Sequence, residues 1–340
     1  MTAQPRLVDV ARAAGVSLST ASRVLGGSRD RVTPGLRDRV LTAADELNYV
    51  PNAPARALAR ATTPTLGLLV HDVGDPYFTE IARGVLRVAD DADLMVMISN
   101  SYREPERELE YIQALRAQRV QAIVLAGSGY RDTGAERLAA VQIRAFEAAG
   151  GRAAVVGRHR LPVDAVLPDN VGGGMATGRL LLDLGHERIG IVAGPPALTT
   201  VDDRLRGFRE ALTAAGIDLP APALVHADFT RDGGRAATAR LLDAMPDMTA
   251  IFALNDAMAI GALAELHHRR IPVPGRMSLT GFDDIPVASD VRPALTTVRV
   301  PMEHMGAEAV RLTLKARSRR PRRRTLTNEV IERASTGPPG

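Results

Sequence analysis

The sequence predicts an all-α headpiece followed by an α/β body of two lobes with parallel sheets. Three observations support this fold class. The first 50 residues contain only short helical patterns, residues 51–64 are rich in proline and small residues, and from residue 65 apolar strands alternate with helical segments in two successive series. A chain of 340 residues is long enough for two or three such units.

Three short helices are expected in residues 1–50. Apolar residues at positions i, i+3, i+4 and i+7 from Leu7 to Ala14 predict a first helix, which Gly15 ends. Ser17 is a suitable N-cap for a second helix that ends at Leu25. Pro34 stands at a favoured first-turn position of a third helix, which runs to about Asn48. The buried face of this third helix is expected to consist of Leu36, Val40, Ala44 and Leu47.

The second of these helices has two different faces. At 100° per residue, one half carries Leu18, Ser19, Ser22 and Arg23, and the other half carries Thr20, Ala21, Val24 and Leu25. The latter half is suited to packing on the first helix, so the former is presented outward. A short helix, a glycine turn and an exposed second helix are typical of the helix-turn-helix, whose second helix enters the DNA major groove. The alternative is that the three helices only cap the α/β body.

Each series of strands and helices in the body predicts one lobe. The first lobe is expected to span about residues 65–160 and 298–318, and the second about 161–297 and 319–340. Strands are predicted at 65–70, 94–99, 122–126, 153–156, 188–193, 223–226, 250–253, 277–280 and 325–331. Helices are predicted near 77–91, 105–118, 136–149, 172–184, 203–215, 231–244 and 256–269. Two such lobes place a ligand between them, at the carboxyl ends of the strands.

Composition and charge restrict the class of protein. The absence of cysteine excludes disulfides, Cys-ligated zinc and thiol catalysis. No signal-peptide pattern opens the chain and no apolar run is long enough for a membrane span, so a cytoplasmic location is expected. Residues 1–62 carry nine Arg against five acidic residues, and residues 315–324 contribute +7, whereas the remainder is acidic. This asymmetry indicates that the headpiece meets a polyanion.

Seven motifs in order along the chain resemble those of the lactose-repressor (LacI/GalR) family of bacterial transcription regulators. They are DVARAAGVSLSTASRVL, LNYVPNAPARALAR, HDVGDPYFTEIARGV, LGHERIGIVAGP, RLRGFREAL, NDAMAIGAL and GFDDIPVA, and the resemblance covers residues 6–337. One departure is the loop GGSRDRV, residues 26–32, which is one residue longer than usual. No base or phosphate role is therefore carried over to Arg29 or Arg31.

The resemblance implies a DNA-binding headpiece in residues 1–50 and a hinge helix or linker in residues 51–64. Leu18, Ser19 and Arg23 match its base-reading positions, and an arginine can bridge guanine O6 and N7. Phosphate contacts are implied for Ser17, Thr20, Ser22 and Asn52. Leu58, three residues after Ala55, matches the hinge leucine that inserts between base steps from the minor groove, although it could instead pack on the body. A hinge this short is expected to become helical only on DNA.

The same resemblance implies that residues 65–340 form a two-lobed, periplasmic-binding-protein-like effector domain that also dimerises. Effector contacts are implied for Asp75, Tyr77, Phe78, Arg158, Arg204, Phe229, Asn255 and Asp283. Three positions depart from the common pattern: Asp75 replaces the usual Asn, Gly157 a frequent Asp, and Val300 a frequent polar residue. The expected effector is a sugar or sugar derivative, with a nucleoside, a sugar acid read by the arginines and a modified sugar left open.

The expected function is therefore an allosteric repressor that binds a pseudo-palindromic DNA operator as a homodimer. Activation, and whether the effector induces or co-represses, are left open. A solute-binding protein without DNA function is the alternative, which the basic headpiece and the missing signal peptide oppose.

A nucleotide-dependent enzyme is disfavoured. The run GGGMATG, residues 172–178, lacks GxGxxG spacing and is interpreted as a flexible helix start. No P-loop, GxSxG elbow or metal-ligand spacing of histidines occurs, so neither enzymatic activity nor a cofactor is expected. The basic run 315–324 is interpreted as a solvated surface loop, with a second DNA-contacting patch as the alternative.

Overall fold

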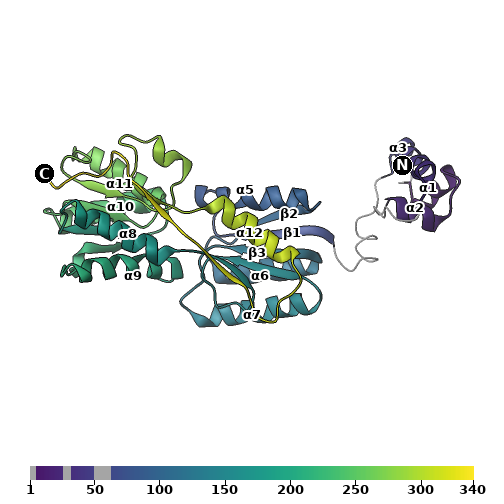
Figure 1. Ribbon diagram of the computed structural model, residues 1–340, viewed down its shortest axis with the longest axis horizontal. Coiled ribbons are helices and arrows are strands. Elements are labelled where there is room, and N and C mark those ends of the chain that lie inside the picture. The colour runs from purple at the N-terminus through teal and green to yellow at the C-terminus, as the bar shows by residue number, and fades with distance from the viewer. Residues whose placement is uncertain (1–4, 26–31, 50–62) are drawn as a thin grey trace. The chain divides into compact units, whose positions relative to one another are not determined.

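The computed structural model describes residues 5–25, 32–49 and 63–340. The chain divides into two compact units, Met1–Thr63 and Pro64–Gly340, hereafter the headpiece and the body (Figure 1). None of the helices in the described ranges combines the length and the apolar character needed to cross a membrane.

The headpiece contains the three expected helices. They are α1 (Leu7–Ala13), α2 (Leu18–Leu25) and α3 (Pro34–Glu46). Their buried residues form one small core that includes Val10, Ala21, Val24 and Val40. Of the residues expected on the buried face of α3, Val40 and Ala44 are buried, whereas Leu36 and Leu47 are half-buried.

The turn between α1 and α2 depends on a glycine and an arginine. Gly15 has a left-handed φ of 63°, which side chains other than glycine adopt at a cost. A Cβ at this position would also lie 2.8 Å from Nη2 of Arg39. That nitrogen donates to the carbonyl oxygens of Ala14 and Gly15, so a side chain of α3 satisfies the end of α1. The sequence does not reveal this role of Arg39.

The first lobe of the body is a six-stranded sheet with helices on both faces. Its strands are ordered β11-β5-β4-β3-β1-β2, namely Arg323–Leu326, Asp164–Pro168, Arg152–Val156, Val120–Ala126, Thr63–Val70 and Met95–Asn100. The side chains of Leu66 and Leu68 face helices α5 (Pro76–Asp91) and α12 (Met302–Leu314). Leu69 faces the opposite side, where α6 (Pro105–Ala117) and α7 (Thr133–Ala148) pack.

The second lobe repeats this plan on a smaller scale. Its parallel sheet is ordered β7-β6-β8-β9, namely Leu224–His226, Ile189–Ala193, Ala250–Ala253 and Ser278–Thr280. The helices are α8 (Asn170–Asp183), α9 (Thr199–Ala214), α10 (Arg231–Ala244) and α11 (Asp256–His268), with short 3-10 turns at Ala221–Ala223 and Pro286–Ser289. A two-stranded antiparallel ribbon of β10 (Thr297–Arg299) and β12 (Glu329–Ile331) completes the body.

Three helix pairs approach each other through reciprocal glycines. A Cβ on any of these glycines would lie 1.8–2.2 Å from a backbone oxygen of the partner helix. The pairs are Gly84 with Gly306 for α5 and α12, Gly174 with Gly207 for α8 and α9, and Gly234 with Gly261 for α10 and α11. The glycine run 172–178 is therefore a close-packed helix start, and its interpretation as a flexible one is wrong.

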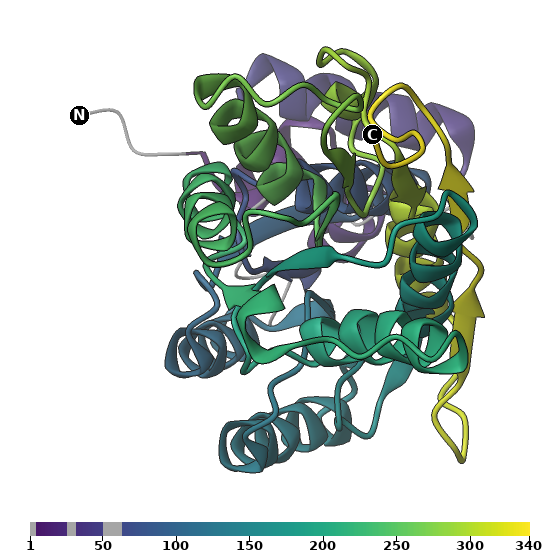
Figure 2. The ribbon, with the colours of Figure 1, turned by 90° about the vertical axis from the view of Figure 1, so that its left-hand side faces the viewer.

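The predicted lobe boundaries and the last strand need correction. Strands β5 and β11 both belong to the sheet of the first lobe, so the boundaries at 161 and 319 are wrong. The single strand expected at 325–331 is two strands in different sheets. The break coincides with Asn328, whose Nδ2 donates to the carbonyl oxygen of Asp169 at 3.0 Å. Figures 1 and 2 show this C-terminal segment, in yellow, running along both lobes.

The basic run 315–324 is attached to the first lobe by buried carboxylates. Arg317 lies 3.3 Å from Glu147, Arg322 lies 2.9 Å from Asp164 and Arg324 lies 3.1 Å from Glu308. All three carboxylates are buried, so these pairs are screened less than surface ion pairs. Most residues of the run are exposed, as expected for a surface loop, and the three paired arginines attach it to the first lobe.

Candidate effector-binding and DNA-binding sites

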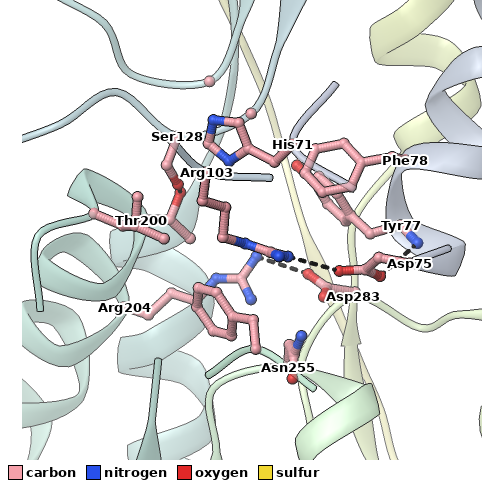
Figure 3. A pocket seen from close by; sticks show the side chains of 14 residues that line it. His71, Asp75, Tyr77, Phe78, Arg103, Ser128, Thr200, Arg204, Asn255 and Asp283 are labelled. Carbon is pink, nitrogen blue, oxygen red and sulfur yellow. Dashed lines mark hydrogen bonds and ion pairs between the residues drawn. The ribbon is translucent and has the colours of Figure 1, made fainter. Parts of the chain in front are cut away.

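A pocket lies between the lobes, at the carboxyl ends of their strands (Figure 3). The space within it is about 450 Å³, part of which is open to solvent. From the first lobe it is lined by His71, Asp75, Tyr77, Phe78, Arg103, Gly127, Ser128 and Gly157, and from the second by Leu198, Thr200, Arg204, Phe229, Asn255 and Asp283. Seven of the eight predicted effector contacts therefore lie together in one pocket, and only Arg158 does not.

Arg158 instead links the two lobes. Its Nε donates to Oδ2 of Asp203 at 2.6 Å, and its Nη2 donates to the carbonyl oxygen of Thr199 at 3.1 Å. The preceding Gly157 lines the pocket, and the side chain of Arg158 is directed to the first turn of α9. The structure thus does not support the expectation that Arg158 contacts the effector.

Further bonds between the lobes lie close to Arg158. The hydroxyl of Ser128 in the first lobe donates to that of Thr200 in the second. The backbone N–H of Thr199 donates to the carbonyl oxygen of Gly129 at 2.9 Å. The start of α9 is therefore bound to the first lobe beside the pocket, in an arrangement that a change in lobe closure would break.

Arg204 and Asp283 form a buried ion pair in the second lobe. Nη2 of Arg204 lies 2.7 Å from Oδ1 of Asp283, and both side chains are almost inaccessible to solvent. The same guanidinium donates to Oδ1 of Asn170 at 3.0 Å and to the carbonyl oxygen of Leu254, and its Cζ lies 3.7 Å above the ring of Phe282. Burial raises the pKa of Asp283 to about 7, although Arg204 opposes this shift.

A second, looser pair faces the pocket from the first lobe. Nη2 of Arg103 lies 3.3 Å from Oδ2 of Asp75, and Nη1 lies 3.6 Å from Oδ2 of Asp72. The other oxygen of Asp75 caps α5 by accepting from the N–H of Tyr77 at 3.0 Å. Burial raises the pKa of Asp75. Figure 3 shows the two Arg–Asp pairs next to each other.

The pocket also contains residues that were not predicted from the sequence, namely Arg103, His71, Ser128, Leu198 and Thr200. Arg103 follows the carboxyl end of strand β2, and this position is the one feature of the sequence that could have placed it at the pocket. Its orientation depends on the loop, where Tyr102 and Arg103 have left-handed φ angles of 55° and 62°. Three residues were noted as departures from the common pattern of the family. Asp75 pairs with Arg103 and Gly157 lines the pocket, whereas Val300 is buried and does not line this pocket.

His71 lies at one end of the pocket in a group of buried titratable side chains. Its Nε2 has no hydrogen-bond partner within the described ranges and lies 3.9 Å from Oε2 of Glu108. Burial, together with the charge of Arg103, lowers the pKa of His71 to about 3. Burial and the neighbouring Glu136 raise the pKa of Glu108 to about 7. Among the described residues no group of His, Asp and Glu has the geometry to hold a metal ion.

Helix α2 of the headpiece presents the outer face that the sequence predicts. Ala21 and Val24 are buried, whereas Ser19, Ser22 and Arg23 are exposed and Leu18 is 52% exposed. Ser17 caps the helix by accepting from the N–H of Thr20 at 3.1 Å, and Thr20 is half-buried. The outward face therefore consists of Leu18, Ser19, Ser22 and Arg23. Asn52, Ala55 and Leu58 lie outside the described residues.

Comparison with known proteins covers both units. Residues 6–52 match the family model of bacterial regulatory proteins of the lacI family, and residues 179–336 match that of a periplasmic binding protein-like domain. The chain is 33% identical to the HTH-type transcriptional regulator DegA of Bacillus subtilis (strain 168), over 98% of each chain.

Solved structures of similar proteins agree with this result. A CelR–cellobiose complex is 34% identical with a TM-score of 0.71 and covers 97% of this chain and 99% of its own. The lac repressor dimer bound to operator and the anti-inducer ONPF is 26% identical with a TM-score of 0.85 and covers 98% and 100%. A solute-binding protein without DNA function would not match the headpiece model, so that alternative is not supported. The chain belongs to the LacI family of DNA-binding bacterial transcriptional regulators.

Proposed function

We propose that this protein is a repressor that binds a two-fold DNA operator as a homodimer and responds to a sugar-like effector held between the lobes of its body. The observation that carries the proposal is the pocket, to which both lobes of the body contribute polar, charged and aromatic side chains. In the headpiece of the same chain, helix α2 packs on the small headpiece core through its opposite face and leaves Leu18, Ser19 and Arg23 exposed. The relatives are regulators, and the proposed role involves no catalysis.

The chemistry of the pocket suits a polyhydroxylated ligand. The carboxylates of Asp75 and Asp283 accept hydrogen bonds from hydroxyls, while Nδ2 of Asn255 and the guanidinium of Arg103 donate them. Tyr77, Phe78 and Phe229 offer aromatic surface to the apolar faces of a ring. The related CelR was solved with cellobiose, which supports a sugar-like effector here.

The bonds between the lobes provide a route from effector to DNA. Ser128, Gly129 and Arg158 of the first lobe hold Thr199 and Thr200 at the start of α9, beside the pocket. A ligand that contacts both lobes changes how favourable this closed arrangement is. Allostery then requires different effector affinities in the DNA-bound and free states, a coupling of about 1–3 kcal/mol.

The edge of the first lobe's sheet supports the dimer. Strand β2 is an edge strand, and it exposes Met95, Met97 and Ile98. An uncovered apolar edge strand favours association with another chain. We assign its partner as a second copy of this chain, because a two-fold operator requires a two-fold protein and the lac repressor is a dimer on its operator.

The double variant Met95→Glu, Ile98→Glu is expected to shift the protein from dimer to monomer and to weaken binding to a two-fold operator by at least about tenfold, because charges would be buried at the interface. Sedimentation velocity and fluorescence anisotropy measure the two effects. Leu138→Glu is the control, since Leu138 is an equally exposed apolar residue on α7. A dimeric double variant, or a monomeric Leu138 variant, would show that β2 is not the interface.

The proposal as a whole is tested by selecting duplexes from a random library with the full chain. The expected product is a pseudo-palindrome whose half-sites are about one helical turn apart. A screen of sugars and sugar derivatives for thermal stabilisation is expected to identify a ligand that changes the affinity for this duplex. Selection of a site without two-fold symmetry would contradict the dimeric reader, and a stabilising ligand without effect on DNA affinity would contradict the allosteric role.

A further inference from the structure

We propose that the effector carries an anionic group, a carboxylate or a phosphate, and that Arg103 is the residue that selects it. This inference rests on the proposed effector function of the pocket and specifies the chemical class of its ligand. No resemblance pointed to Arg103, and its side chain lies between the residues of both lobes in Figure 3.

Of the two arginines that line the pocket, Arg103 uses fewer of its donors on the described part of the chain. A guanidinium carries five N–H groups, and that of Arg103 makes one hydrogen bond, of 3.3 Å, to Asp75. Arg204 differs, because its Nε, Nη1 and Nη2 all donate to protein groups and the residue is buried. Arg103 lies 5.9 Å from the ring of Phe229 across the pocket, so its free N–H groups are within reach of a ligand between the lobes.

Several acceptors of the pocket are already engaged within the protein, and Asn255 offers donors without partners among the described residues. Oδ1 of Asn255 accepts from the N–H of Met258, which leaves its Nδ2 amide hydrogens free. Oδ1 of Asp75 accepts from Tyr77, and the hydroxyls of Ser128 and Thr200 bond to each other. Such a site matches a ligand rich in acceptors.

His71 also lines the pocket, but its unpartnered nitrogen does not contribute to this inference. Nε2 of His71 has no partner among the described residues, yet the atom is inaccessible and lies 3.9 Å from Oε2 of Glu108. The preference for an anion is therefore assigned to Arg103.

The two carboxylates of the pocket do not prevent anion binding. Asp283 is paired with Arg204 and Asp75 with Arg103, so the two pairs together are neutral. Asp72 is half-exposed, and water screens its charge. Three helices, α5, α9 and α11, begin at the pocket, and their N-terminal dipoles favour negative charge there.

Calorimetric titration of the full chain with matched ligands tests the proposal. The pairs are D-galacturonate with D-galactose, D-gluconate with D-glucitol, and glucose 6-phosphate with glucose, so the two anionic groups are tested separately. At least one anion is expected to bind at least about tenfold more tightly than its neutral partner, since a hydrogen bond to a charged group is worth about one to two decades of affinity.

Variants at position 103 assign this preference to the residue. Arg103→Gln is expected to weaken binding of the anion by about 10- to 100-fold and binding of its neutral partner by a clearly smaller factor, because a hydrogen bond to a neutral group is worth less than one to a charged group. Arg103→Lys is expected to retain more of the anion affinity than Arg103→Gln because it keeps the charge. Arg107→Gln is the matched control, because Arg107 lies on the same segment, is exposed and pairs with Glu104.

The outcomes separate this inference from the proposed function. Tighter binding of a neutral sugar than of its acid, or an unchanged anion affinity in Arg103→Gln, overturns the anionic class and leaves a sugar-like effector in place. Binding of none of the six ligands overturns the inference, whereas the wider screen of sugars and sugar derivatives decides whether the pocket binds a sugar-like effector.

Discussion

Replacing Arg204 with methionine is expected to destabilise the body by about 3–5 kcal/mol, because the change leaves the carboxylate of Asp283 buried without its counter-charge. The ion pair is 2.7 Å long between almost inaccessible side chains, so solvent cannot replace the guanidinium. The carbonyl of Leu254 and the amide oxygen of Asn170 would also lose a donor. This is the largest loss of stability that we expect from a single substitution in the pocket.

Denaturation by urea measures the effect, and the double variant Arg204→Met, Asp283→Leu is expected to recover a large part of the lost stability. Arg206→Met is the control on the same helix, since Arg206 is more than half exposed, and it should change stability by about 0.5 kcal/mol or less. If Arg204→Met unfolded at the same urea concentration as the parent protein, the ion pair would contribute no net stability.

The pH dependence of the parent protein follows from the same group. Burial raises the pKa of Asp283 to about 7 in the folded state, above its ordinary value of 3.8. The folded protein therefore binds the proton more readily than the unfolded chain, and this group contributes stability that is lost as pH rises from about 4 to about 7. Removing Arg204 raises this pKa further, so the loss in Arg204→Met is expected to be larger at pH 8 than at pH 5.

The sequence was most informative where one local pattern determines the structure. The period of α2 distinguishes its buried residues from its exposed ones, because a helix repeats every 3.6 residues whatever it packs on. The outward position of Leu18, Ser19 and Arg23 could therefore be predicted and is confirmed. Most of the predicted strands and helices of both lobes lie within a few residues of their expected ends, whereas β5, β10 and α12 were not predicted.

Predictions failed where the direction of a side chain depends on distant contacts. Arg158 and Arg103 both follow a strand of the first lobe, yet one binds Asp203 of the second lobe and the other enters the pocket. Local sequence contains no signal that separates these two directions. The passage of the C-terminal segment from the sheet of β11 to that of β12 also depends on a distant contact. Asn328 lies between these strands and bonds to the backbone of Asp169, far away in the sequence.

Replacing Arg23 with alanine is expected to weaken binding to the selected operator by about 2–6 kcal/mol for the dimer, because a bidentate arginine contact to guanine is worth about 1–3 kcal/mol in each half-site. Arg23 is exposed on the outward face of α2, so its removal should not unfold the headpiece. Among the described residues, Arg23 bonds through its Nε alone, at 3.3 Å to the carbonyl oxygen of Ser19, which leaves both Nη groups for DNA.

Fluorescence anisotropy with the selected duplex and a scrambled one distinguishes base reading from phosphate contact. A base-reading arginine loses affinity for the operator and much less for the scrambled duplex, whereas a phosphate-binding arginine weakens both alike. Arg12→Ala is the control, because Arg12 is exposed on α1 and is not part of the outward face of α2. Equal losses on both duplexes in Arg23→Ala would assign Arg23 to the DNA backbone, and operator selectivity would then have to come from the other outward residues, Leu18, Ser19 and Ser22.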